Sequence, residues 1–199
     1  MPASTSTYVV RRQDQLTSLA SPVRIEILDA IRVNGPCSIG RVGEFLGRAP
    51  DSLYYHVRKL VRVGLLIECG KHKSGRRDGA LYKTPAPHIR TPFELERPER
   101  AASVRAVYDG LLRLTQRDLR DTVRSGGLAS RGSRRNIRHA RLKGRLTRSE
   151  LREANRHIDA LLKIFSRRKN PEQSADAPLY ALTTFLLPLR GARRSKQAP

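Results

Sequence analysis

Six side chains between residues 52 and 62 can hydrogen-bond to a ligand or carry positive charge. They are Ser52, Tyr55, His56, Arg58, Lys59 and Arg62. Hydroxyl, imidazole and cationic groups on one surface are suited to contact the base edges and phosphates of a nucleic acid. The chemistry they favour is therefore recognition of a polyanion.

A helix over residues 49–63 would bring these side chains onto one surface. Leu53, Val57 and Leu60 recur at i, i+4 and i+7, which places an apolar stripe behind the polar residues. Pro50 suits the first helical position and Gly64 suits a helix end. The pattern predicts a short amphipathic helix whose polar front fits the major groove of DNA.

The elements before this segment complete a known motif. A helix is predicted from Ser21-Pro22 to Asn34-Gly35, and a second begins at Ser38 and ends at Gly47. Only a short turn at residues 48–50 lies between the second helix, which ends at Gly47, and the apolar stripe of the 49–63 segment, which starts at Leu53. Two short helices joined by so tight a turn indicate a helix-turn-helix.

The residues after Gly64 change from a helical period to a period of about two, which is typical of strands. Strands are expected over 65–69 and 80–84. The glycine-rich stretch between them carries the basic residues Lys71, His72, Lys73, Arg76 and Arg77. This pattern predicts a β-hairpin with a basic tip over residues 71–79, which is the wing of a winged helix.

The overall charge favours a polyanionic partner. The chain holds 40 Lys and Arg against 18 Asp and Glu, a formal net charge of +22. Residues 1–90 contain 15 basic and 7 acidic side chains, and residues 91–199 contain 25 and 11. Such an excess implies nucleic acid first and an anionic membrane second.

Cysteine content and hydropathy indicate a cytoplasmic protein. Cys37 and Cys69 are too few for a disulfide framework and suggest a reducing compartment. The first ten residues lack the charged start and apolar core of a signal peptide, and no apolar run reaches the roughly 20 residues of a membrane span. We expect a cytoplasmic, nucleoid-associated protein with no membrane contact.

Residues 14–88 resemble the ArsR-like winged-helix transcriptional regulators. The likeness is carried by SLASPVRIEILDAI, then by SIGRVGEFLGRAPDSLYYHVRKLVRVGLL, and then by the KHKSGRRDG hairpin, in that order. The resemblance implies a dimeric bacterial repressor or activator that grips a partly palindromic operator in double-stranded DNA.

Metal sensing does not carry over from this resemblance. The metal sensors of the family place a cysteine pair near the start of the helix before the turn, where this chain has only Cys37. Soft-metal sites need three or four ligands. We expect Cys37 to be a small buried residue, and we expect no metal and no cofactor.

The candidate DNA-contacting residues come from three elements. The helix before the turn, the 49–63 recognition helix and the 71–79 wing contribute Ser38, Arg41, Asp51, Ser52, Tyr54, Tyr55, His56, Arg58, Lys59, Arg62, Lys71, Lys73, Arg76 and Arg77. A solvated helix face and a charged hairpin without a ligand are the alternatives. For His56, packing against the first helix is also open.

The C-terminal half is predicted to join helices and strands. A helix over 98–123 carries Ala101, Val104, Tyr108, Leu111, Thr115 and Leu119 at steps of three and four. That spacing is close to a heptad seam and favours dimerisation over a purely internal core. Residues 131–148 contain eight Arg or Lys and no acid, and within them apolar and basic residues alternate as in a strand.

The sequence that follows predicts a further helix and a further strand. Thr147 and Glu150 form a capping box at the start of an amphipathic helix. Residues 179–187 are rich in β-formers and stop at Pro188. The basic 131–148 stretch could contact nucleic acid, hold an acidic ligand or form a solvated face.

The expected fold is α+β. It consists of an N-terminal winged helix-turn-helix domain, a helical dimerisation segment and a small strand-helix-strand C-terminal region. The expected boundaries are a flexible tail over 1–13, the DNA-binding domain over 14–88, a linker over 89–97, the dimerisation region over 98–190 and a disordered basic tail over 191–199.

Three classes of function compete. A sequence-specific regulator that binds its operator as a homodimer leads, and a nonspecific nucleoid or RNA-binding protein is the alternative. A sensor that holds a small-molecule effector in its C-terminal region is the third. The five histidines are scattered and no GxSxG, P-loop or HExxH motif occurs, so we expect no enzyme and no catalytic residue.

Overall fold

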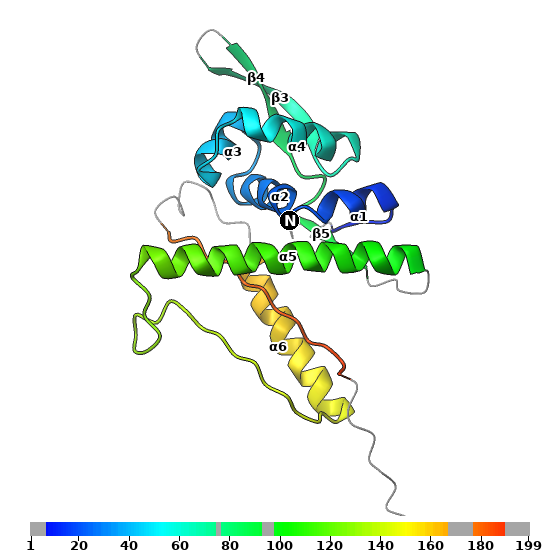
Figure 1. The fold of residues 1–199 in the computed structure, drawn as a ribbon, viewed down its shortest axis with the longest axis vertical. Helices are drawn as coiled ribbons and strands as arrows, with labels where there is room; N and C mark the ends of the chain where they lie inside the picture. Colours follow the sequence, from blue (N-terminus) through cyan, green and yellow to red (C-terminus); the bar gives the residue numbers. More distant parts are fainter. Residues whose placement is uncertain (1–6, 75–76, 93–97, 167–176, 190–199) are drawn as a thin grey trace, which may run out of the picture.

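The computed structural model describes residues 7–74, 77–92, 98–166 and 177–189, and for residues 72–74, 77 and 78 it describes the backbone alone. Helices and strands are mixed, as expected. Figure 1 shows the N-terminal elements lying on one side of a long helix, α5, while the helix α6 points away on the other side. Among the described residues no helix is long and apolar enough to cross a membrane.

The first four helices form the N-terminal body. They are α1 (Gln13–Leu19), α2 (Pro22–Asn34), α3 (Ile39–Leu46) and α4 (Asp51–Arg62). The hydroxyl of Ser38 caps α3 by accepting a bond from the Arg41 N–H at 3.3 Å, and Gly47 ends it with a left-handed φ of 61°. These starts and ends match the predicted helices within one or two residues.

Three strands form a small sheet beside these helices. The order is β2 (Cys37–Ser38), β4 (Arg77–Lys83), β3 (Ile67–Ser74), all antiparallel. The register of β3 and β4 pairs Lys71 with Ala80 and shifts at residues 68–70. The predicted hairpin is therefore present. It starts later than expected, because Leu65 and Leu66 bond to the carbonyl of Leu60 and enter the core instead.

The N-terminal tail prediction is wrong for residues 7–13. Strand β1 (Thr7–Val9) pairs in parallel with β5 (His88–Arg90), and Val10 is fully buried. The first and last strands of the domain therefore pair with each other. Local periodicity could not predict this pairing of distant segments. The domain runs past the expected boundary at residue 88, and β5 occupies the start of the predicted linker. The expected tail over 191–199 and residues 93–97 lie outside the described residues.

One core unites α1 to α4 with the start of α5. Its fully buried side chains include Leu16, Ile27, Leu53 and Leu60. Gln15 is buried among them, and its amide donates to the carbonyl of Val63 at 2.9 Å. The amide thereby fixes α1 against the end of α4, because a buried amide needs a partner.

Helix α5 (Pro98–Ser125) packs on α1 and α2. Its buried stripe is Val104, Val107, Gly110 and Leu114. Gly110 permits the approach, since a Cβ there would lie 2.6 Å from the carbonyl oxygen of Ala20. The face that packs on the N-terminal body overlaps the predicted seam only in part, at the buried Val104 and at Tyr108, which packs against the core.

The C-terminal half departs most from prediction. Helix α6 (Arg148–Ser166) forms, and the Thr147–Glu150 capping box is confirmed by reciprocal bonds of 2.7 and 3.3 Å. The strands expected within 131–148 and over 179–187 are wrong, because neither segment adopts regular secondary structure in the described chain. A strand needs a partner for its backbone, and neither segment has one here.

Candidate nucleic-acid interface

Helix α4 separates its apolar and polar residues onto opposite faces. Leu53, Val57 and Leu60 are buried in the core. On the other side, residues 51, 55, 58 and 62 recur at i, i+4, i+7 and i+11 and are all exposed, with Tyr55 at 67%. The predicted recognition surface is therefore a continuous exposed face.

Several cations on α4 and on β3 have no partner among the described residues. Among the described residues, Arg58, Lys59, Arg62 and Lys71 form no ion pair and no side-chain hydrogen bond. Because an arginine that already holds a carboxylate would have to release it to bind a phosphate, these four are the groups most ready for an anion.

Other predicted contact residues are already engaged. Arg41 forms an exposed ion pair with Glu44 at 3.1 Å. The Ser52 hydroxyl donates to the carbonyl of Ala49 at 2.7 Å, and its oxygen can still accept a bond. Ser38 is committed to capping α3. Asp51 is exposed in the first turn of α4, where its charge complements the helix dipole.

His56 sits at the edge of the recognition surface. Its ring meets that of Tyr55 edge-on with centroids 5.4 Å apart, and its buried Nδ1 has no hydrogen-bond partner among the described residues. Burial lowers the pKa of His56, and the nearby charges of Arg24 and Arg48 lower it further. Both effects favour the neutral imidazole.

Two arginines near His56 extend the basic surface beyond α4. Arg24 of α2 donates to the carbonyl of Thr17 at 3.2 Å and also to that of Ser18. Arg48 lies in the turn before α4. The sequence analysis named neither residue as a contact. Arg24 belongs to a helix whose pattern indicates a core element, and Arg48 lies in the turn just before α4.

Tyr54 lies on the opposite flank of α4, toward the hairpin. It is 44% exposed. Burial raises the pKa of the Tyr82 phenol in β4; Glu68 and Tyr54 raise it further, and Arg58 opposes them. The charges and phenol that act on Tyr82 thus include two groups of α4, Tyr54 and Arg58.

The hairpin projects beyond α3 and α4 at the far end of the N-terminal body (Figure 1). Lys71 is exposed on β3. The backbones of Lys73 and Arg77 lie in β3 and β4, while their side chains and the whole of Arg76 are outside the described residues. The described parts of β3 and β4 thus extend away from the core.

The turn between α3 and α4 is closely packed. The Arg48 N–H donates to the carbonyl of Gly43 at 2.9 Å. A Cβ on Gly43 would lie 2.7 Å from the Arg48 carbonyl oxygen and 3.3 Å from Pro50. Only glycine permits this approach, which sets how α4 leaves α3.

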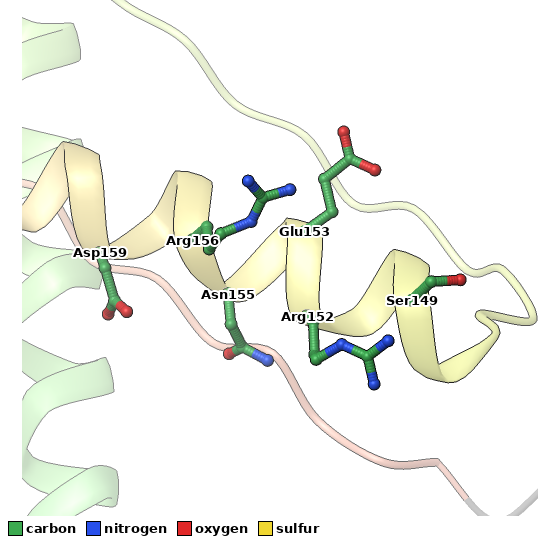
Figure 2. A pocket seen from close by; sticks show the side chains of 6 residues that line it. All are labelled: Ser149, Arg152, Glu153, Asn155, Arg156 and Asp159. Atoms are coloured by element: carbon green, nitrogen blue, oxygen red, sulfur yellow. The ribbon is translucent and has the colours of Figure 1, made fainter.

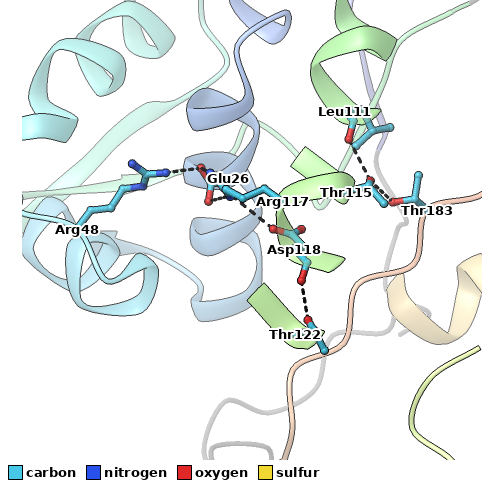
Figure 3. A network of polar contacts seen from close by, with 8 residues as sticks. All are labelled: Glu26, Arg48, Leu111, Thr115, Arg117, Asp118, Thr122 and Thr183. Atoms are coloured by element: carbon cyan, nitrogen blue, oxygen red, sulfur yellow. Dashed lines mark hydrogen bonds and ion pairs between the residues drawn. The ribbon is translucent and has the colours of Figure 1, made fainter. Parts of the chain in front are cut away.

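An ion-pair network connects this turn to α5, as Figure 3 shows. Glu26 of α2 accepts bonds from Arg48 at 3.3 Å and from the Arg117 Nη1 at 3.0 Å. The pKa of Arg117 is raised, first by its hydrogen bond to Glu26. Glu26 and Arg117 are 91 residues apart, so no local pattern could have found them.

Helix α6 carries a hollow on its polar face, shown in Figure 2. Its lining residues are Ser149, Arg152, Glu153, Asn155, Arg156 and Asp159. All belong to one helix, so they do not enclose a small molecule, and this hollow gives no support to an effector site.

The two cysteines differ in setting. Cys37 is buried as expected, and burial raises the pKa of its thiol, while Cys69 is exposed. Among the described residues no three His, Cys, Asp or Glu side chains gather as a metal site would require.

Helices α3 and α4 are joined by a tight turn, and α4 carries an exposed polar face. This arrangement defines a DNA-binding helix-turn-helix. Residues 19–69 match the family model described as a helix-turn-helix domain. This match covers α2, α3, α4 and the start of β3, and it points to a regulator more than to an enzyme. No curated protein sequence matches the chain significantly.

Proposed function

We propose that this protein is a bacterial, sequence-specific transcriptional regulator of the ArsR-like winged-helix type. In this proposal α4 enters the major groove and the β3–β4 hairpin acts as the wing. The protein acts in the cytoplasm, on the nucleoid, and binds its operator as a homodimer.

The observation that carries the proposal is the unpartnered state of Arg58, Lys59 and Arg62 among the described residues. They lie on α4 beside the exposed phenol of Tyr55. Cations hold α4 on the phosphate backbone, and the hydroxyls of Ser52 and Tyr55 can contact base edges. Pairing these cations with acids one turn away would stabilise the helix by about 0.2–0.5 kcal/mol per pair, and α4 forms no such pair among the described residues.

The hairpin adds affinity in this proposal. Lys71 and the basic residues of the tip, Lys73, Arg76 and Arg77, would contact flanking phosphates or the minor groove. Each phosphate neutralised should make log K fall by about 0.9 per unit increase in log salt concentration.

A two-fold operator requires two α4 helices about one helical turn of DNA apart. Helix α5 and the C-terminal half would join two copies. Selection of bound duplexes from a random pool tests the whole proposal, because it returns both the sequence and the half-site spacing. Recovery of two related half-sites supports it, and recovery of the unselected pool overturns it.

A nonspecific nucleoid or RNA-binding protein is the second candidate. The observation that favours it is the exposed stretch 131–148, which carries eight Arg or Lys and no acid. Footprinting in the presence of random-sequence competitor separates the two candidates, since a nonspecific binder protects all duplexes equally.

A further inference from the structure

The C-terminal half exposes two extended segments that have the side-chain pattern of strands but no strand partner. These are residues 138–146 and residues 179–187. Among the described residues no backbone–backbone hydrogen bond involves either segment. Backbone groups in extended conformation with free edges are a template for pairing with another chain.

Apolar side chains on both segments face solvent. Leu142 is 91% exposed and Leu187 is 57% exposed. The apolar face of α6 is only partly covered, with Leu151, Leu161, Leu162 and Phe165 each 41–49% exposed. Many large apolar side chains exposed in one region of the chain suggest an interaction surface.

The second segment is held in place while its edges stay free. The hydroxyls of Thr183 and Thr115 are 2.9 Å apart (Figure 3), and the ring of Phe185 meets Tyr108 edge-on at 5.9 Å. Thr183 and Phe185 are two residues apart and so share one face of an extended chain. That face contacts α5, and the backbone remains available at the side.

The two segments do not meet within one chain. In Figures 1 and 2 the stretch before α6 and the stretch of residues 177–189 pass along different sides of this helix. The polar face of α6, with Arg152, Glu153 and Arg156, is suited to water. Its apolar face needs a cover that the chain does not itself provide among the described residues.

The charges of the two segments favour pairing of residues 138–146 with residues 179–187 over pairing of residues 138–146 with a second copy of themselves. Residues 138–146 contain Arg138, Arg141, Lys143 and Arg145 and no acid, whereas residues 179–187 contain no charged residue. Two copies of the basic segment would place like charges opposite one another, which is destabilising. The uncharged segment has no such conflict with the basic one.

We propose that a second copy of this chain supplies the missing strand partner. Residues 138–146 of one copy pair with residues 179–187 of the other, and the resulting sheets cover the apolar faces of both α6 helices. This inference deepens the homodimer of the proposed function and rests on it. It also places the dimer contact across α5 from α4, which leaves both recognition helices free.

Mixed-disulfide formation in the full-length chain tests this pairing. In a Cys69→Ser background, one copy carries Leu142→Cys and a differently tagged copy carries a single cysteine at each position from 179 to 187 in turn. Cross-strand neighbours lie on one face, so linkage between the two tags should recur at every second position. Val33→Cys, exposed on α2, is the matched control and should not link to Leu142→Cys.

Sedimentation of arginine variants provides the second measurement. Leu142→Arg and Leu182→Arg should each weaken dimerisation at least tenfold, whereas Val33→Arg should leave it unchanged. Circular dichroism separates loss of pairing from loss of folding.

Three outcomes would overturn the inference. They are a chain that stays monomeric, linkage only between copies that carry the same cysteine, and no linkage between Leu142→Cys and any position from 179 to 187. A dimer that binds its operator but links only identical positions would reject the strand exchange and leave the proposed function standing. A monomer that binds DNA would reject both the strand exchange and the homodimer of the proposed function.

Discussion

Glu26 of α2 and Arg117 of α5 form a two-pronged ion pair, in which the guanidinium donates to both carboxylate oxygens. The Glu26 side chain is only 12% exposed and that of Arg117 is 30% exposed. The same carboxylate accepts a bond from Arg48 in the turn before α4. One residue thus connects the long helix to the element that orients the recognition helix.

Replacing Glu26 should cost more than replacing an ordinary surface acid. Glu26→Gln would leave Arg48 and Arg117 without their shared carboxylate, and we expect the free energy of unfolding to fall by about 1–3 kcal/mol. Asp121→Asn, which breaks an exposed pair with Arg124, should change it by less than about 0.5 kcal/mol. Chemical denaturation measures both, and equal effects would refute the role assigned to Glu26.

Gly43 and Gly40 form a matched pair on α3. Gly43→Ala must displace the carbonyl of Arg48, so unfolding free energy should fall by about 1–3 kcal/mol and DNA affinity should fall with it. A Cβ on Gly40 meets only the Ser38 hydroxyl at 3.7 Å. Gly40→Ala should therefore be neutral or stabilise the helix by up to about 1 kcal/mol. A Gly43→Ala protein with unchanged stability would show that the turn is looser than described.

The unpartnered arginines of α4 should determine the salt dependence of DNA binding. Arg58→Ala and Arg62→Ala should each make the slope of log K against log salt shallower by about 0.9 for every phosphate lost. Arg105→Ala removes the same charge from the exposed side of α5 and should leave the slope unchanged. Fluorescence anisotropy at several salt concentrations gives the slopes. Equal changes in all three variants would mean that net charge alone governs binding.

The neutral His56 should make stability depend on pH. The unfolded imidazole takes up a proton near its ordinary pKa of about 6.5, while the folded one resists it because its pKa is lowered by burial, Arg24 and Arg48. The unfolded state therefore binds more protons in this window, and stability falls as the pH drops from about 6.5 toward the lowered pKa.

His56→Gln should remove that part of the pH dependence, and His139→Gln, an exposed residue of the 126–147 stretch, should not. Thermal unfolding between pH 7.5 and 5 compares the variants with the parent. An unchanged slope in His56→Gln would contradict the assignment of a neutral imidazole.

The N-terminal body was largely predictable from sequence because its signals are local. Leu53, Val57 and Leu60 mark the buried side of α4, and Ser38 and Gly47 mark the ends of α3. The parallel pairing of β1 with β5 and the bond between Glu26 and Arg117 join residues about 80 to 90 positions apart. Such contacts leave no periodic trace, so the pattern assigned residues 7–13 to a tail.

The C-terminal half shows the limit of period-based reasoning. Residues 139–146 alternate as a strand would, yet the described chain offers them no partner. The predicted seam of α5 also makes contacts within the chain, since Tyr108 meets Phe185 and Thr115 meets Thr183. A pattern identifies what a segment can form, and only the tertiary contacts decide whether it forms.

The most direct test of the account is competition binding with a duplex selected from a random pool. The parent protein should prefer the selected duplex over random DNA by about 10³-fold or more. Tyr55→Ala combined with Lys59→Ala should abolish that preference while circular dichroism shows the fold intact. Equal affinity of the parent for all duplexes, or a preference that survives the double substitution, would contradict the assignment of α4 as the recognition helix.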